Sequence, residues 1–140
     1  MYSMRVKSVM ERKKLLVAPP GTTVAKAARM MAKKNVGAVM VVDGKLLVGI
    51  FTERDAVFRV VAEGRDVATT TIGEVMSADP ICVPPDEIFG RALLLMHDNG
   101  FRHVPVVENG EPIGIVSSRS ALDPEMEEFT AETQRRLSLR

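Results

Sequence analysis

Apolar residues follow two kinds of spacing along the chain, and each kind occurs twice. Spacings of three and four residues, typical of a helix with one apolar face, are found in two sets. These sets are Val24, Ala27, Ala28 and Met31, and Phe89, Ala92, Leu93 and Met96. Short stretches rich in β-branched residues predict strands over residues 38–42 and 46–51, and again over 103–107 and 112–116. Asp43-Gly44 and Asn109-Gly110 separate the members of each strand pair, and such dipeptides favour a tight hairpin turn.

The two sets are copies of one pattern at an offset of 65 residues. The alignment runs without a gap from Pro20 and Pro85 to Val57 and Leu122, and ten aligned pairs are identical. Just upstream, Val9-Met10 matches Val75-Met76 at an offset of 66. An internal repeat of this size indicates that one supersecondary unit is built twice.

Each copy adds an extended stretch before its first helix and a helix after its second strand. The extended stretches cover residues 15–18 and 81–83 and run into Pro-Pro, which excludes helix. The second helices are expected to start at Thr52 and at Ser117. The order is β-α-β-β-α, twice. Because three short strands cannot bury their sheet alone, we predict an α/β fold in which two copies pack sheet to sheet as a pseudo-twofold pair.

Three regions follow from this organisation. The first motif is expected over residues 1–67, the second over 68–122, and a C-terminal helical tail over 123–140. Thr71 and Glu74 have the spacing of a capping box for a short helix that ends at Val75-Met76. In the tail, Asp123-Pro124 has the pattern of an N-cap and first helical residue, and acidic residues then precede basic ones, as the helix dipole favours.

Composition limits the partners and the compartment. The 19 basic and 18 acidic residues leave a net charge of +1, so no general field attracts nucleic acid or an anionic membrane. The apolar runs are strand-length and too short to span a membrane, and basic residues interrupt the N-terminus, so no signal peptide is expected. Cys82 is the only cysteine, which excludes an internal disulfide and a CxxC metal knuckle. We therefore expect a cytoplasmic protein.

Two segments carry a family resemblance when they are taken together with the repeat. They are Gly49-Ile50-Phe51-Thr52-Glu53-Arg54-Asp55 and Gly100-Phe101-Arg102-His103-Val104-Pro105-Val106-Val107. In this setting the chain resembles the CBS domain pair, a module found beside cystathionine β-synthase and many channels and enzymes. The resemblance covers residues 5–122. It implies a regulatory module that binds an adenine nucleotide (AMP, ADP, ATP or NAD(H)) between its motifs, forms a homodimer and signals to a partner protein.

The first of these segments has a chemical logic of its own. Gly49 would let a ligand approach the strand backbone, and Thr52 stands where the strand gives way to a helix whose free amides can bind phosphate. Asp55, one turn later, offers two acceptor oxygens to two adjacent ribose hydroxyls. The plainer interpretation is that Thr52 and Asp55 only cap the helix. Inside the repeat we favour binding, and both roles can coexist.

The resemblance implies Thr52 on phosphate, Asp55 on ribose, and backbone near residues 17–18 and 36–38 around the adenine. Arg102-His103 stands where the first copy has Gly37-Ala38, so a long cation could reach phosphate through the space that small residues leave. The alternatives are a solvated charge for Arg102 and a partly buried polar side chain for His103. The predicted nucleotide-binding residues are Val17, Ala18, Val36, Gly37, Ala38, Thr52, Arg54, Asp55, Arg102 and His103.

The second copy has Ser120 where the first has Asp55. A single neutral hydroxyl is a poorer partner for a ribose diol than a carboxylate, so we expect a second, weaker site. Its predicted residues are Cys82, Val83, Phe101, Ser117, Arg119 and Ser120.

Other chemistry has little support in the sequence. Two histidines and one cysteine without ligand spacing predict no metal site, and no nucleophile lies in a recognisable turn motif. An enzyme is therefore disfavoured. The remaining alternative to nucleotide binding is a ligand-free module that holds a protein partner through its helices and tail.

Overall fold

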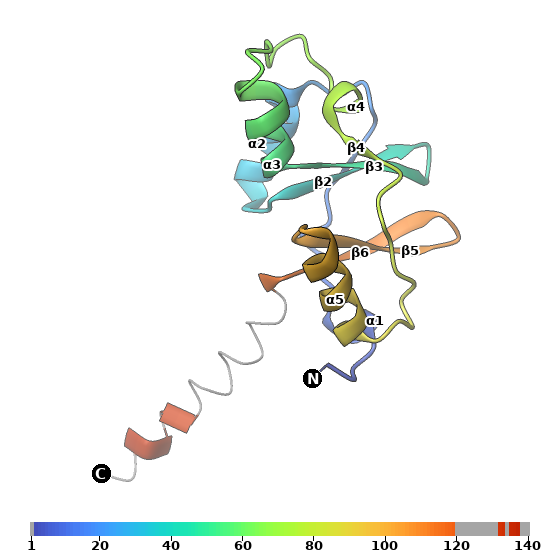
Figure 1. Ribbon diagram of the computed structural model, residues 1–140, viewed down its shortest axis with the longest axis vertical. Coiled ribbons are helices and arrows are strands. Elements are labelled where there is room, and N and C mark those ends of the chain that lie inside the picture. Colours follow the sequence, from blue (N-terminus) through green and yellow to red (C-terminus); the bar gives the residue numbers. More distant parts are fainter. Residues whose placement is uncertain (1, 120–131, 134, 138–140) are drawn as a thin grey trace.

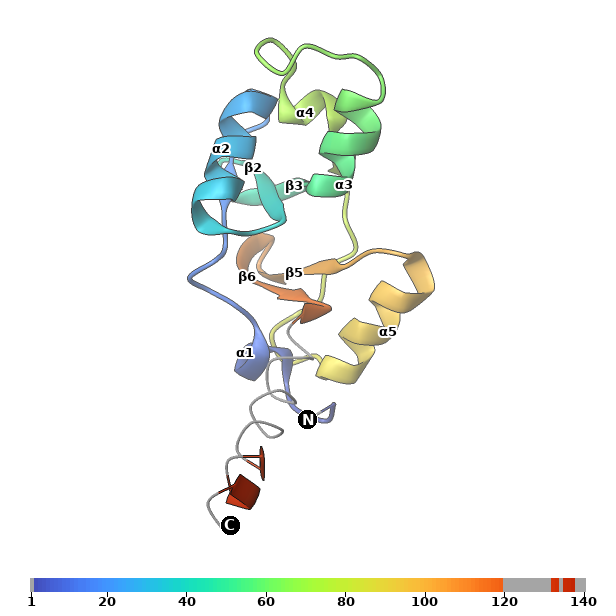
Figure 2. The ribbon, with the colours of Figure 1, turned by 90° about the vertical axis from the view of Figure 1, so that its left-hand side faces the viewer.

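The computed structural model describes residues 2–119, 132–133 and 135–137. Figures 1 and 2 show two halves, each with its sheet facing the other half and its helices on the outside. In chain order the elements are α1 (Val6–Val9), β1 (Val17–Ala18), α2 (Val24–Lys34), β2 (Ala38–Asp43), β3 (Leu46–Thr52), α3 (Glu53–Asp55), the π-helical segment η1 (Ala56–Val61), α4 (Ile72–Val75), β4 (Ser77–Ala78), α5 (Phe89–Asn99), β5 (His103–Glu108) and β6 (Glu111–Ser117).

The first sheet has the strand order β1-β2-β3-β4, and the second consists of β5 and β6. β1 pairs with β2 in parallel, and the other pairs are antiparallel. Both predicted hairpins are confirmed. Their turns use positive φ angles at Gly44 (62°), Asn109 (54°) and Gly110 (80°), as a tight reversal requires.

The two predicted amphipathic helices are also confirmed. α2 buries Val24, Ala27 and Met31, and α5 buries the residues that align with them, Phe89, Ala92 and Met96. The Thr23 hydroxyl accepts a hydrogen bond from the Lys26 amide at 3.2 Å and so caps the start of α2. Both helices end on a left-handed residue, Asn35 in α2 and Gly100 in α5.

The facing sheets meet in a small apolar layer. Ala38, Met40 and Ile50 of the first sheet are buried there and contact Ile115 of the second. A hydrogen bond from the Leu47 amide to the Gly110 carbonyl, 2.9 Å long, joins the two hairpins. The predicted sheet-to-sheet pair is the observed architecture.

Each copy is completed by a segment that precedes the other copy in the chain. We call residues 5–11 and 71–78 the lead-in segments. Val6 belongs to the second core, with Phe89 and Val104, whereas Ile72 and Val75 belong to the first. In matching fashion, the second lead-in segment adds β4 beside β3, and Glu11 of the first pairs with Ile115 of β6. The lead-in segments are thus exchanged between the halves.

The structure differs from the prediction in the extended stretches. Only Val17–Ala18 of residues 15–18 forms a strand, and of residues 81–83 only Val83 pairs, in an isolated parallel bridge with Val106. Pro80 and Pro84 flank the second stretch and have no amide hydrogen to donate to a ladder. The capping box of Thr71 and Glu74 is present. Most of the helix expected after Ser117 and of the tail over 123–140 lies outside the described residues.

Candidate functional site

Two cavities open where the ends of β3 and β6 meet the other half of the molecule. The Thr52 cavity has a volume of about 790 Å³ and the Ser117 cavity of about 410 Å³, sizes that hold small organic ligands. Among the described residues, the Thr52 cavity is lined by Ile50, Thr52, Glu53, Arg54, Asp55, Val57, Phe58, Arg59, Ser77, Pro80, Ile81, Asn99, Gly100, Phe101, Arg102 and His103. The Ser117 cavity is lined by Glu11, Lys14, Met31, Ala32, Asn35, Val36, Gly37, Ala38, Glu53, Arg102, His103, Ile115, Ser117, Ser118 and Arg119.

Thr52 and Asp55 form a complete capping box at the start of α3. Asp55 Oδ2 accepts hydrogen bonds from the Thr52 amide at 2.9 Å and from its hydroxyl at 3.2 Å, while the Thr52 hydroxyl accepts one from the Asp55 amide at 3.3 Å. Thr52 and Asp55 therefore do cap the helix, as the plainer interpretation of the sequence proposed. Asp55 is only 6% exposed, yet it borders the cavity, so a ligand would meet a carboxylate that is already oriented.

Arg59 orients the other oxygen of that carboxylate. Its Nε lies 3.6 Å from Asp55 Oδ1, and its Nη1 donates to the Met76 carbonyl at 2.9 Å. The second lead-in segment therefore helps to hold Asp55. Sequence reasoning missed Arg59, although the spacing of four residues from Asp55 on a helix is the signal that could have found it.

The Thr52 cavity combines this carboxylate with cations and an apolar wall. The Arg54 guanidinium stacks over the Phe58 ring at 4.6 Å from its centroid, so it is held at the rim of the cavity. Phe58, Ile81 and Phe101 supply apolar surface. Such a cavity can take a flat ring, a diol and an anion together. Phe58 and Ile81 were also missed, because neither lies in a repeated motif.

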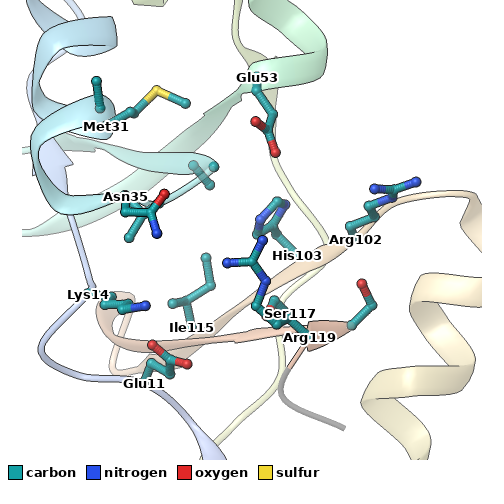
Figure 3. A pocket seen from close by; sticks show the side chains of 15 residues that line it. Glu11, Lys14, Met31, Asn35, Glu53, Arg102, His103, Ile115, Ser117 and Arg119 are labelled. Atoms are coloured by element: carbon teal, nitrogen blue, oxygen red, sulfur yellow. The ribbon is translucent and has the colours of Figure 1, made fainter. Parts of the chain in front are cut away.

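Glu53, Arg102 and His103 line both cavities and form their shared wall. Figure 3 shows Glu53 extending from α3 toward His103. Burial lowers the pKa of His103, and Arg102 and Arg119 lower it further, against the opposing charge of Glu53. His103 is therefore neutral near pH 7, so it acts as a hydrogen-bonding group rather than a fixed charge.

The absence of a side chain at position 37 leaves room for this wall. A Cβ on Gly37 would lie 2.6 Å from Glu53 Oε1 and 3.3 Å from His103 Nε2. The space that Gly37 leaves is thus partly filled by Glu53, a residue that sequence reasoning did not single out.

The structure regroups the predicted residues across the two copies. Val36, Gly37 and Ala38 were expected beside Thr52 and Asp55, but they line the Ser117 cavity with Ser117 and Arg119. Phe101 was expected in the second site, but it lines the Thr52 cavity. The physical reason is the opposed packing of the sheets, which sets the end of each copy's last strand against the other copy's first helix and loop. Ser120 lies outside the described residues.

The remaining predicted residues lie away from both cavities. Val17 and Ala18 border neither, because β1 is at the edge of the sheet opposite to β4, where the Thr52 cavity opens. Val83 is buried in the second core. The half-buried Cys82 thiol donates to the Pro80 carbonyl at 3.1 Å, and burial raises its pKa, which disfavours the reactive thiolate form.

The role predicted for Gly49 needs correction. A Cβ on Gly49 would overlap the sulfur of Met76, and a Cβ on Gly114 would lie 2.6 Å from the sulfur of Met10. Each glycine therefore makes room for the methionine of a lead-in segment rather than for a ligand.

Two further features concern the described part of the chain only. It holds no cluster of three or more potential metal ligands. None of its helices has the length and apolar character needed to cross a membrane.

Comparisons with known proteins agree with this architecture. A family model described as CBS domain matches residues 6–62 and 72–124. The chain is 43% identical over 110 residues to the CBS domain-containing protein CBSCBSPB3 of Arabidopsis thaliana, an alignment that covers 78% of this chain and 20% of the relative. The chain spans about a fifth of the length of the first curated relatives that it matches.

Solved structures with this fold include two complexes. A CBS domain protein of Pyrobaculum aerophilum complexed with AMP is 28% identical, with a TM-score of 0.76 over 84% of this chain and 89% of the other. The CBS domain pair of protein MJ0100, in complex with 5-methylthioadenosine and S-adenosyl-L-methionine, is 27% identical, with a TM-score of 0.77 over 84% of this chain and 96% of the other.

Proposed function

This chain belongs to the CBS domain family, and from that premise we propose that it is a non-catalytic regulatory module. It binds an adenine nucleotide in the cavities between its two motifs and transmits their occupancy to a partner protein. The observation that carries the proposal is the Thr52 cavity, in which a preset carboxylate, several guanidinium groups and an apolar wall converge.

The ligands of the two related structures favour adenosine as the common element. AMP, 5-methylthioadenosine and S-adenosyl-L-methionine share an adenine and a ribose and differ in what the 5′ position carries. In the Thr52 cavity we assign the adenine to the apolar wall at Ile81 and Phe101, and the ribose hydroxyls to Asp55. Thr52, Arg54 and Arg102 with His103 then face the 5′ group.

The Ser117 cavity is proposed as the second, weaker site. Residues 36–38 take the place of the apolar wall there, and Ser117 and Arg119 replace Thr52 and Arg54. AMP, ADP, ATP and NAD(H) all carry the adenosine element and are the ligands to compare.

Calorimetric titration of the chain with adenosine, AMP, ATP and NAD⁺ tests the proposal. We expect Asp55→Ala to reduce binding at the Thr52 cavity at least tenfold, because one hydrogen bond to a charged acceptor is worth about 1.5–3 kcal/mol. Loss of the capping box should also lower the free energy of unfolding, by about 0.5–2 kcal/mol.

Glu74→Ala separates these two effects. It removes the matching capping box at Thr71, which lines neither cavity, so it should lower stability without changing affinity. The proposal fails if no adenosine compound binds, or if Asp55→Ala and Glu74→Ala have the same effect on affinity.

We also propose that the chain forms a homodimer. Val61 of η1 is 70% exposed, and Val57 and Phe58, which also line the Thr52 cavity, are 53% and 55% exposed, so η1 carries an apolar surface suited to an interface. Sedimentation of the wild type and Val61→Glu across micromolar concentrations tests this, and a wild-type monomer throughout would refute it. A cytoplasmic location is likewise a proposal, testable by cell fractionation.

A further inference from the structure

Glu53 is the one carboxylate, among the described residues, that lines both cavities. Its backbone amide donates to the Gly37 carbonyl at 3.0 Å, which fixes the start of α3 against the other wall of the Ser117 cavity. Its side chain lies over Gly37 and extends toward His103 (Figure 3). The carboxylate therefore sits at the junction of the cavities.

The charge of Glu53 is not neutralised by a direct partner in the described part of the chain. No lysine, arginine or histidine nitrogen there lies within 4.0 Å of it in an ion pair. His103, toward which Glu53 extends, is uncharged near neutral pH because burial and the two flanking arginines lower its pKa. An anion that reaches the junction meets this negative charge.

Counted over the described residues, the lining of each cavity has only a small excess of positive charge. Arg54, Arg59 and Arg102 face Asp55 and Glu53 in the Thr52 cavity, which leaves an excess of one. Lys14, Arg102 and Arg119 face Glu11 and Glu53 in the Ser117 cavity, with the same result. A cavity built for a triphosphate would need more cations, since each added phosphate brings further negative charge.

We propose that Glu53 sets the charge selectivity of both cavities. It favours adenosine compounds whose 5′ group is neutral, cationic or a single phosphate, and it opposes the additional phosphates of ADP and ATP. This selectivity rests on the proposed function and adds to it the class of 5′ group that is accepted.

The test compares adenosine, AMP, ADP and ATP on the wild type and Glu53→Gln by calorimetry without divalent cations. Glu63→Gln is the matched control, because it removes the same charge from an exposed position that lines neither cavity. In Glu53→Gln we expect the affinity for ATP relative to AMP to rise roughly tenfold, as the loss of one nearby, partly screened charge predicts. In Glu63→Gln, both the adenosine affinity and the ATP-to-AMP affinity ratio should stay within about twofold of wild type.

The possible results distinguish charge selectivity by Glu53 from the binding of adenosine compounds itself. If adenosine and AMP bind but the ATP-to-AMP ratio is the same in wild type and Glu53→Gln, charge selectivity by Glu53 is refuted and the proposed function stands. If no adenosine compound binds the wild type, both are refuted. A second variant, Glu53→Ala, should give the same rise in the ratio, and its melting temperature verifies that the fold is retained.

Discussion

The hairpin of β2 and β3 and the hairpin of β5 and β6 carry the same irregularity at the same place. The pairing register shifts between Val41 and Val42 in the first and between Val106 and Val107 in the second. Each hairpin also has a glycine, Gly49 or Gly114, against which a methionine of a lead-in segment packs. The two halves therefore share one backbone structure, which we call the frame. It includes the register shift in the hairpin and the glycine that contacts the methionine of a lead-in segment.

The walls of the two cavities do not share this likeness. Gly37-Ala38 contributes to the Ser117 cavity, whereas the aligned Arg102-His103 reaches both cavities. The glycines and the register shift of the hairpins are alike in the two copies, whereas part of the cavity lining, such as Gly37-Ala38 and the aligned Arg102-His103, differs. Frame and selectivity can therefore be altered separately, which the following predictions exploit.

The largest effect is expected where the frame is shared. Gly49→Val should lower the free energy of unfolding by about 3 kcal/mol, because its side chain would displace Met76, which is partly buried against the first core. Gly114→Val should have a comparable effect through Met10. Gly21→Val is the control, since a Cβ there meets nothing within 4 Å. Denaturant unfolding measures all three, and a neutral Gly114→Val would contradict the equivalence of the halves.

The next effect concerns the acceptor that only the first copy has. Ser120→Asp should raise the affinity of the Ser117 cavity by about 2 kcal/mol, the value of a well-placed hydrogen bond to a charged group. Asp55→Ser is the reciprocal change and should weaken the Thr52 cavity. Calorimetry resolves the two sites. Two equal sites in the wild type would show that the carboxylate does not set occupancy.

A smaller effect on affinity distinguishes Arg102, which lines both cavities, from Arg54 and Arg119, which each line one. Arg102→Gln should weaken AMP binding in both cavities by about 1 kcal/mol each, the lower end for a charged hydrogen bond that is partly exposed. Arg54→Gln should affect only the Thr52 cavity and Arg119→Gln only the Ser117 cavity, because each lines one of them. If Arg102→Gln changes a single site, the shared wall is not functional.

The smallest effect is a pH dependence of stability. Burial holds the pKa of His103 below its usual value of 6.5, so the unfolded chain binds this proton more readily than the folded one. Stability should therefore fall as the pH decreases from above 6.5 toward the folded-state pKa. Melting temperatures of the wild type and His103→Gln between pH 5 and 8 should show a shallower acid decline in the variant. Equal slopes would contradict the burial of this imidazole.

The repeat made most of the fold predictable. The helices that begin at Val24 and Phe89 and the two hairpin turns are local structures. They could be predicted because they depend mainly on residues that are close together in the chain. The capping role of Thr52 and Asp55 was predictable for the same reason. These features need no knowledge of how the two copies meet.

The grouping of the cavity residues could not be predicted in this way. The grouping depends on which strand end faces which helix when the two copies pack together. The sequence alignment of the copies contains no information about this packing. The structure therefore does not bring Val17 and residues 36–38 to the Thr52 cavity of their own copy, whereas Arg102 lies in the wall that both cavities share. The change of offset from 65 to 66 at Val9-Met10 was the one sign that the lead-in segments are separate units.

The exchange of the lead-in segments has a consequence for how the chain acquires its structure. Glu11 forms an isolated antiparallel bridge with Ile115, so the two paired residues are separated by 104 positions in the chain. Such distant pairings are slow to close, and during synthesis the first segment must wait for nearly the whole pair to emerge. Neither half can finish its core on its own. We therefore expect the pair to fold and unfold as one cooperative body, with both cavities appearing and disappearing together.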